Sequence, residues 1–358
     1  MDLRRLHLDR TLLYALLALA GISLLAVYSA SGKNLGMAGA HALRLLFGFA
    51  IMLGVAQMRP ENIERWSPYL FAFGLVLLVL VLGVGSIGKG AQRWLNLGIR
   101  VQPSEVMKLT LPMMLAWYLA RADLPPTLLR LGVGFLIAAI PAALIAKQPD
   151  LGTAALVFAA GAFTLFLAGM RWTIIAALAI AVAAAMPVAW NFMHDYQRHR
   201  ILTLFNPQAD PLGTGYHTIQ SMIAVGSGGF YGKGWLNSSQ AHLEYLPEAG
   251  TDFIFAVFAE EFGLIGSLML LGLYVFIGIR IMLIAFYAQD SYSRLLAGGL
   301  ALIFFFSFFV NIGMVTGILP IVGVPLPVMS YGGSSIITVM AAFGILMSIH
   351  THRRIVEQ

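Results

Sequence analysis

Apolar residues dominate this chain in long, nearly uninterrupted runs. Runs such as Thr11–Ala30 and Leu70–Val84 contain few charges and lack the alternation of a half-exposed strand. Such runs are typical of helices that cross a membrane. We therefore predict an all-α polytopic membrane protein with about ten spanning helices, at residues 11–30, 41–58, 68–85, 105–120, 130–147, 152–168, 172–191, 253–284, 295–317 and 329–349.

The orientation follows from one break and from the distribution of arginine. Lys147-Gln148-Pro149-Asp150 interrupts the run 130–168, and proline ends a helix at the preceding residue, so this run is counted as two spans. An even number of spans returns both termini to one side. With the termini in the cytoplasm, the short inner segments contain only arginine as positive charge, as the positive-inside rule expects: Arg4, Arg5, Arg10, Arg59, Arg65, Arg121, Arg130, Arg171, Arg280, Arg294, Arg353 and Arg354.

The composition excludes a soluble protein. Of 358 residues, 59% are hydrophobic and 11% are charged, whereas a soluble domain contains about 25% charged residues. We expect a single integral membrane domain over 1–358. The chain has no cysteine, which excludes disulfides and thiolate metal sites. Its net charge of +6 fits anchoring to anionic lipid, and no nucleic-acid partner is expected.

The remaining positive charges fall on the outer half, mainly near two loops, 86–104 and 192–251. A cationic outer surface suits an anionic ligand, although ordinary hydrophilic loops are the alternative for any one residue. The loop 192–251, between the seventh and eighth spans, is the longest connection and is predicted to be extracytoplasmic. It contains aromatic residues, His217 and many glycines, so we expect short helices packed on the membrane surface.

Carboxylates beside the spans are the sharpest chemical signal, because charge inside a bilayer is costly. Asp252 directly precedes the apolar run 253–258. A carboxylate against apolar surface suits a general base, and a helix N-cap is the alternative role. Glu260 and Glu261 follow in the same run, about 12–14 Å deeper along a helix. They must pair or face a polar cavity, as partners for arginines, as a proton path or as a cation site.

Two further segments carry candidate chemistry. In residues 100–108, Glu105 and Lys108 are three residues apart and share one helix face. They could form an ion pair of their own, or Arg100 and Lys108 could bind phosphate as forked donor and point charge. The second segment, 317–335, is too rich in glycine, proline and serine for a continuous helix. Irregular backbone at membrane depth must be buried or line a cavity, so we expect a broken segment that shapes an internal cleft.

These motifs resemble those of the SEDS family (shape, elongation, division and sporulation), and the loop length is closer to its elongation branch than to its division branch. The matching stretches cover most of the chain from about residue 90 onward: Gly90-Ala91-Gln92-Arg93-Trp94-Leu95, Gln102-Pro103-Ser104-Glu105 with Lys108, Asn206-Pro207 with Asp210-Pro211, Gly213 to Gly234, Leu246-Pro247-Glu248 with Thr251-Asp252-Phe253, Glu260-Glu261-Phe262-Gly263, and Asn311 to Ser335.

The resemblance implies a peptidoglycan glycosyltransferase of the bacterial cytoplasmic membrane. It would polymerise lipid II into glycan strands at the outer face for cell elongation and shape. Its implied partners are a class B penicillin-binding protein, which supplies the transpeptidase, and other membrane proteins of cell elongation. Three other functions stay open: a lipid II flippase or transporter, a non-enzymatic scaffold of the elongation complex, and a polymerase of another lipid-linked polysaccharide.

The resemblance also implies roles for individual residues. The family's essential aspartate falls on Asp252, as general base. Binding of substrate pyrophosphate is expected at Arg93, Arg100 and Lys108, with Glu105 orienting Lys108 or the substrate. A divalent cation, Mg²⁺ or Mn²⁺, could share this task, but no ligand set in the sequence is specific enough to name. Residues expected to line or support the cavity are Gln102, Ser104, His217, Glu260, Glu261 and Ser330.

Overall fold

The structure is a computed structural model that describes residues 7–88, 91–96, 100–193, 198, 202–204, 214–243, 245–246 and 248–352. Each of the ten predicted spans contains a helix: α1 (Arg10–Ala30), α2 (Leu35–Ala56), α3 (Pro60–Val84), α4 (Pro103–Ala120), α5 (Leu128–Lys147), α6 (Leu151–Leu167), α7 (Trp172–Phe192), α11 (Ile254–Phe286), α12 (Ser291–Val315) and α13 (Ser334–Thr351). Among the described residues, seven helices are long and apolar enough to cross a membrane: α1, α2, α3, α5, α11, α12 and α13.

Several helix ends differ from the prediction because local capping fixes them. α2 begins six residues before the predicted start, since the Asn34 side chain accepts a hydrogen bond from the backbone N of Met37 at 3.1 Å. α3 begins at Pro60, which is preorganised for a first helical position. α13 begins only at Ser334, because the residues before it are not helical. The predicted span 329–349 is therefore wrong over its first five residues.

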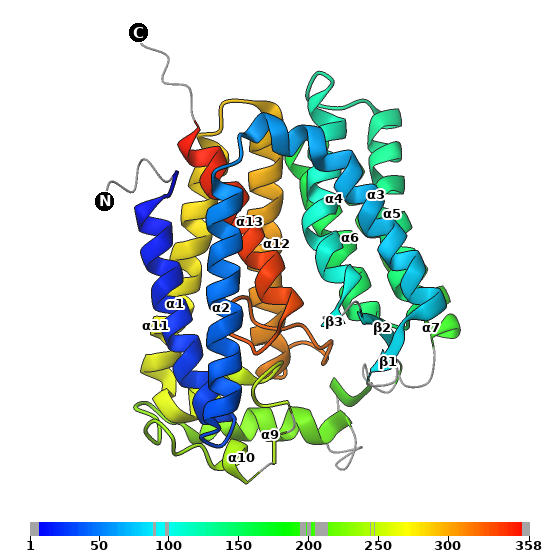
Figure 1. Cartoon of the computed structure of the whole chain (residues 1–358). Helices are drawn as coiled ribbons and strands as arrows, with labels where there is room; N and C mark the ends of the chain where they lie inside the picture. Colours follow the sequence, from blue (N-terminus) through cyan, green and yellow to red (C-terminus); the bar gives the residue numbers. More distant parts are fainter. Residues whose placement is uncertain are drawn as a thin grey trace.

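The helices run side by side, with both chain ends at one end of the bundle (Figure 1). The opposite end carries α9 (Thr214–Ser227) and α10 (Ser239–His242), and α9 lies across the helix ends. The expected short helices in the loop 192–251 are thus present in its described part. Residues 194–197, 199–201, 205–213, 244 and 247 of this loop lie outside the described residues, and the predicted motif residues Asn206, Pro207, Asp210, Pro211 and Pro247 are among them.

A small sheet at the same end corrects the all-helical prediction. β1 (Ser86–Gly88), β2 (Ala91–Asn96) and β3 (Arg100–Val101) pair antiparallel in the order β1-β2-β3. The chain between α3 and α4 has no apolar run, so the hydropathy pattern gave no signal for strands.

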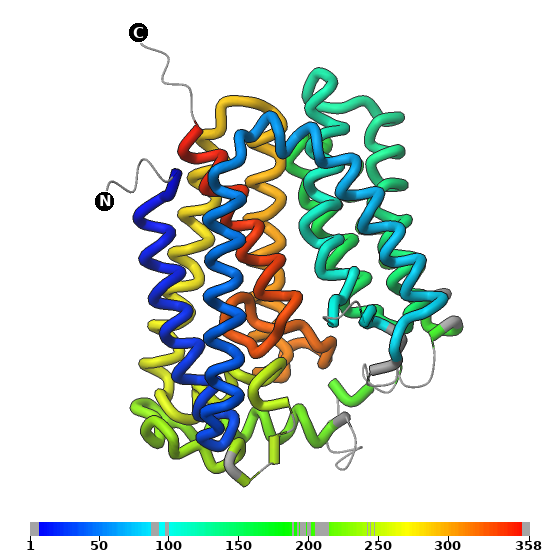
Figure 2. The backbone as a smooth tube through the Cα atoms, in the orientation of Figure 1, coloured from blue at the N-terminus to red at the C-terminus, as the bar shows by residue number. Residues whose placement is uncertain are grey.

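Two groups of helices form the bundle. α3 packs on α4 and α5 on α6, while α2 packs on α13 and α11 on α12. α12 also packs against α4 and α6 and so joins the groups. Between α12 and α13, the chain loops within the bundle before it turns back as α13 (Figure 2). This non-helical stretch is where the candidate site lies.

Candidate active site

The segment between α12 and α13 is irregular backbone held by polar side chains of three helices. Tyr274 of α11 donates from its hydroxyl to the carbonyl of Pro327 at 2.7 Å, and Asn311 of α12 donates from Nδ2 to the carbonyl of Val324 at 2.7 Å. The Ser23 hydroxyl of α1 lies 2.9 Å from the carbonyl of Met329. These donors satisfy carbonyls that no helix pairs, which confirms the predicted buried, broken segment.

Asp252 lies against this broken segment. Asn311 Nδ2, which also bonds to Val324, donates to the backbone carbonyl of Asp252 at 2.9 Å. The Ser330 hydroxyl donates to the carbonyl of Thr251 at 2.6 Å, and the backbone N of Tyr331 donates to the carbonyl of Gly250 at 2.9 Å. The Asp252 carboxylate faces Gly323 so closely that a Cβ at that position would lie 3.4 Å from Oδ2. The backbone on both sides of Asp252 is therefore fixed.

The alternative role of Asp252 as a helix cap is wrong. The N-cap of α11 is Phe253, and no side chain makes a capping hydrogen bond there. Asp252 is half-buried, one residue before that cap. Asp252 therefore does not occupy the N-cap position of α11, and its carboxylate lies beside Gly323.

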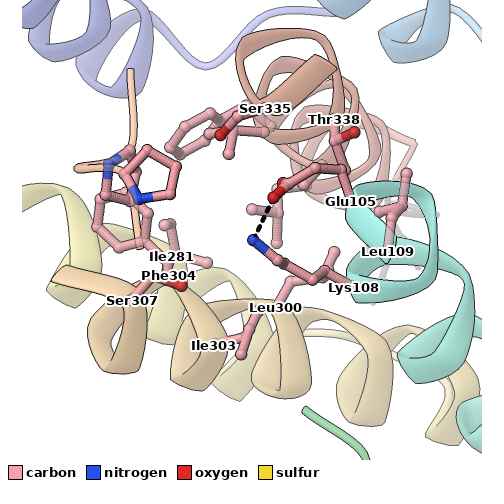
Figure 3. A pocket seen from close by; sticks show the side chains of 16 residues that line it. Glu105, Lys108, Leu109, Ile281, Leu300, Ile303, Phe304, Ser307, Ser335 and Thr338 are labelled. Atoms are coloured by element: carbon pink, nitrogen blue, oxygen red, sulfur yellow. Dashed lines mark hydrogen bonds and ion pairs between the residues drawn. The ribbon is translucent and has the colours of Figure 1, made fainter. Parts of the chain in front are cut away.

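An apolar cavity adjoins this segment (Figure 3). It holds about 590 Å³ of empty space, counting the part that opens to the surroundings. Its walls are mostly apolar side chains of α11, α12 and α13, with Pro325 and Pro327 of the broken segment. Ser307 also lines it, one helical turn from Asn311, so the cavity and Asp252 share a wall of α12. Its largely apolar lining suits the apolar part of an amphipathic molecule.

Glu105 and Lys108 provide the charge in the cavity wall. Lys108 Nζ lies 2.6 Å from Glu105 Oε1, and their side chains are 13% and 6% exposed (Figure 3). Pro103 begins α4, which places both residues in its first two turns. The predicted self-satisfied pair is therefore confirmed, and it lies in the wall of the cavity; its role in binding phosphate stays a prediction. Gln102 lies at the N-cap without a side-chain cap bond, and Ser104 is buried in the first turn.

The other two predicted phosphate ligands lie apart from this cavity. Arg93 on β2 pairs through Nε with Asp150 Oδ2 at 3.2 Å, and Asp150 also caps α6 by accepting from Thr153 N. Arg100 is exposed on β3 and does not line the cavity. Sequence reasoning missed Asp150 as the partner of Arg93, because 57 residues separate them.

Glu260 is paired as expected, but its partner is a lysine. Its carboxylate is fully buried and lies 2.6 Å from Lys233 Nζ. It also accepts from Ser238 Oγ at 2.5 Å, from Ser239 N at 3.1 Å and from Gln240 N at 3.3 Å. Glu261 accepts from Ser29 Oγ and from the backbone N of Leu236. Both glutamates therefore hold the outer loop against α11.

The expectation that these glutamates lie deeper than Asp252 is wrong. α11 breaks at Gly263, whose φ of 64° and ψ of −162° are not helical, so residues 254–262 form a separate first half. Glu261 contacts Ser29, one residue from the end of α1. Ser23 lies six residues before Ser29 on α1, which is about 9 Å further from that end of the helix. Ser23 contacts Met329, and the neighbouring Ser330 bonds to Thr251, beside Asp252. The first half of α11 therefore does not run inward from Asp252.

Two predicted supporting residues flank Asp252. His217 of α9 stacks on Phe253, with ring centroids 6.2 Å apart and planes 19° apart. The Ser330 hydroxyl accepts from the backbone N of Leu326 at 2.8 Å and donates to the carbonyl of Thr251. Ser330 thus supports the backbone, and α9 covers the start of α11.

Asn311 is the residue of the candidate site that sequence reasoning missed most clearly. It is fully buried within an apolar run, and a polar residue there must find partners. Ser23, Tyr274 and His41 are likewise buried polar residues within apolar runs. His41 Nε2 lies 2.6 Å from Ser23 Oγ.

Replacing Asn311 by leucine is expected to lower thermal stability and activity together. The buried carbonyl of Val324 and the partly buried carbonyl of Asp252 would lose their donor, at a cost of about 1–3 kcal/mol for the buried one. The melting temperature of the purified variant, read by fluorescence-detected gel filtration, measures the effect. Asn191→Leu is the matched control, because the side-chain amide of exposed Asn191 donates to the carbonyl of Pro187 in its own helix and reaches no other segment among the described residues. An unchanged melting temperature for Asn311→Leu would mean that water or another donor replaces the amide.

Among the described residues, no group of three or more His, Cys, Asp or Glu side chains could hold a metal ion. The expected divalent cation therefore has no protein ligand cluster in the part of the chain that the structure describes. It stays a prediction.

Comparisons with known proteins show the family of the chain. A family model described as a cell cycle protein, covering FtsW, RodA and SpoVE, matches residues 8–355. The peptidoglycan glycosyltransferase MrdB of Escherichia coli strain K12 is 52% identical over 356 residues, which are 99% of this chain and 96% of that protein.

Two solved structures share the fold. One belongs to a peptidoglycan synthase complex described as coordinating polymerization and crosslinking; it is 30% identical with a TM-score of 0.85, over 97% of this chain and 98% of that chain. The other is the rod shape determining protein RodA of Thermus thermophilus, which is 26% identical with a TM-score of 0.74, over the same shares.

Proposed function

The chain belongs to the FtsW/RodA/SpoVE family, and from this premise we propose that it polymerises lipid II into glycan strands at the outer face of the cytoplasmic membrane. It is a multi-pass membrane protein and a peptidoglycan glycosyltransferase that acts in cell elongation and shape. The observation that carries the proposal is Asp252, fixed by Asn311 and Ser330 beside an apolar cavity whose wall contains Lys108.

The proposed topology has ten spans, with both termini in the cytoplasm and the loop 192–251 outside. Two observations support it. The chain ends lie at the end of the bundle opposite α9, α10 and the strands. The connections α2–α3, α4–α5 and α6–α7, whose positive charges are arginines, lie at the end of the bundle where α1 begins and α13 ends, and this distribution is expected of cytoplasmic loops. In this topology Asp252, which follows the loop 192–251, lies toward the outer leaflet.

In the proposed reaction, Asp252 acts as general base. Its carboxylate takes the proton of the acceptor sugar's 4-hydroxyl as the oxygen attacks the anomeric carbon of the donor. The new bond is the glycosidic C–O bond, and the bond that breaks joins the anomeric carbon to the pyrophosphate. Polyprenyl pyrophosphate leaves with the bonding electron pair.

The charge that develops on the leaving group needs preorganised cations. Lys108 supplies one inside the cavity, with Glu105 fixing the position of its ammonium group at 2.6 Å. The apolar walls contributed by α12 and α13 accommodate part of the polyprenyl chain. Arg93 acts indirectly, because its pair with Asp150 ties the small sheet to the start of α6. Arg100 is exposed and could meet the substrate as it enters.

The proposed partner is a class B penicillin-binding protein, which would crosslink the strands that this chain makes. Support comes from the solved relative whose complex is described as coordinating polymerization with crosslinking. Other membrane proteins of cell elongation are proposed to join the same assembly.

A polymerisation assay tests the function. The purified chain, with a penicillin-binding partner free of transferase activity, receives labelled lipid II, with Mg²⁺ or with EDTA. Glycan polymer that forms in either condition supports the transferase, and a difference between the two tests the divalent cation. A flippase or a scaffold forms no covalent product. Labelled lipid II that stays unpolymerised with a folded, partnered chain would reject the proposal.

A further inference from the structure

We propose that Arg44 of α2 is a binding residue for the pyrophosphate of the lipid substrate, on the side of the site formed by α2 and α13. The inference rests on the proposed function and deepens it, because it assigns a second anion-binding group besides Lys108. The evidence is the placement of the Arg44 guanidinium, its lack of a counter-charge and its closeness to the cavity wall.

The Arg44 guanidinium is held against the broken segment. Its Cζ lies 4.2 Å from the centroid of the Tyr331 ring, and a Cβ on Gly333 would lie 4.0 Å from its Nε. The backbone N of Tyr331 donates to the carbonyl of Gly250, two residues before Asp252. Arg44 is therefore fixed to the same backbone that positions the proposed general base.

Three other cations on the outer half of the described chain have a carboxylate partner, whereas Arg44 has none among the described residues. Lys108 pairs with Glu105, Arg93 with Asp150 and Lys233 with Glu260. Among the described residues, Arg44 makes no ion pair, and its buried Nη1 has no hydrogen-bond partner. A buried N–H without an acceptor is costly. Stacking on Tyr331 holds the guanidinium plane and leaves its N–H edge for a phosphate, which guanidinium binds in a forked geometry.

The position of Arg44 joins it to the cavity. Gly333, beside its Nε, is the N-cap of α13 and carries no side-chain cap, so the first backbone N–H groups of α13 lie next to the guanidinium. Ser335 and Thr338 of this helix line the cavity, as does Lys108 of α4 (Figure 3). Lys108 is neutralised by Glu105, whereas Arg44 contributes an uncompensated positive charge. Arg44 is therefore expected to attract a diphosphate more strongly than Lys108 does.

Direct binding in neutral phosphatidylcholine nanodiscs tests the inference without turnover. The probes are undecaprenyl pyrophosphate and undecaprenol, measured with the full chain and with Arg44→Gln. We expect at least a tenfold weaker affinity of the variant for the pyrophosphate lipid, since a charge-assisted hydrogen bond is lost, and no change for undecaprenol. Arg44→Lys, which keeps the charge but cannot fork or stack, is expected to show an intermediate loss.

Arg121→Gln is the matched control, because Arg121 also stacks on an aromatic ring, 3.8 Å from the Trp117 centroid, outside the site. It should bind both probes like the wild type. Equal losses for both probes in Arg44→Gln would show a structural role and overturn the proposal, as would no loss at all. Displacement of the pyrophosphate lipid by added phosphatidylglycerol would assign the site to membrane phospholipid. If Arg44→Gln does not fold, Arg44→Lys decides by the same comparison. The binding experiment involves no polymerisation, so it can be interpreted even if the polymerisation assay fails.

Discussion

Asp252→Asn is expected to reduce glycan polymerisation by about 10²- to 10⁴-fold, the usual contribution of a general base. The amide has nearly the size of the carboxylate but cannot take the proton of the acceptor hydroxyl. The backbone contacts should survive, because Asn311 and Ser330 bind the carbonyls of Asp252 and Thr251 and not the carboxylate. The rate of polymer formation from labelled lipid II measures the effect, and the melting temperature checks the fold.

Asp290→Asn is the matched control for this substitution. Asp290 caps α12 by accepting from the backbone N of Ser293 at 2.8 Å, and asparagine caps a helix about as well as aspartate. The control should therefore keep both stability and activity. Equal amounts of polymer from wild type and Asp252→Asn would support the transferase activity but show that Asp252 is not its general base.

Glu260→Gln is expected to destabilise the protein by about 1–3 kcal/mol, the cost of leaving buried donors unsatisfied, because the Lys233 side chain that loses its partner is 33% exposed and can be hydrated. The fully buried carboxylate accepts from Lys233, Ser238, Ser239 and Gln240. A glutamine amide replaces one acceptor oxygen by a donor, which would face these donors. The outer loop should then separate from the first half of α11. A lower melting temperature and faster proteolysis of the loop would measure this.

A double-mutant cycle separates the pair from the rest of the cluster. Lys233→Met alone leaves the Glu260 charge buried, and the double variant removes both charges, so it should be less destabilised than the sum of the single variants. Exposed Glu61, in the first turn of α3, provides the control Glu61→Gln, for which a change within about 0.5 kcal/mol is expected. A Glu260→Gln variant as stable as the wild type would show that the cluster does not hold the loop.

The sequence alone determined the helices and the identity of the main candidate residues. Apolar runs long enough to span a membrane predict helices locally, and each predicted run contains one. Asp252 and the Glu105–Lys108 pair were identified because charges beside apolar runs are rare and costly. Helix starts such as Asn34 and Pro60 were missed, since capping acts on residues just outside the apolar pattern.

The tertiary structure alone decided which groups meet. Lys233, and not an arginine, neutralises Glu260 because the chain breaks at Gly263 and the outer loop folds back over the first half of α11. Asn311 and Ser330 fix the backbone at Asp252 because a buried carbonyl without helical partners must take a donor from whichever helix packs beside it. Partners 59 or 79 residues apart leave no periodic trace in the sequence. Hydropathy is a local property of the chain, whereas the pairing of buried polar groups depends on the packing of the whole bundle.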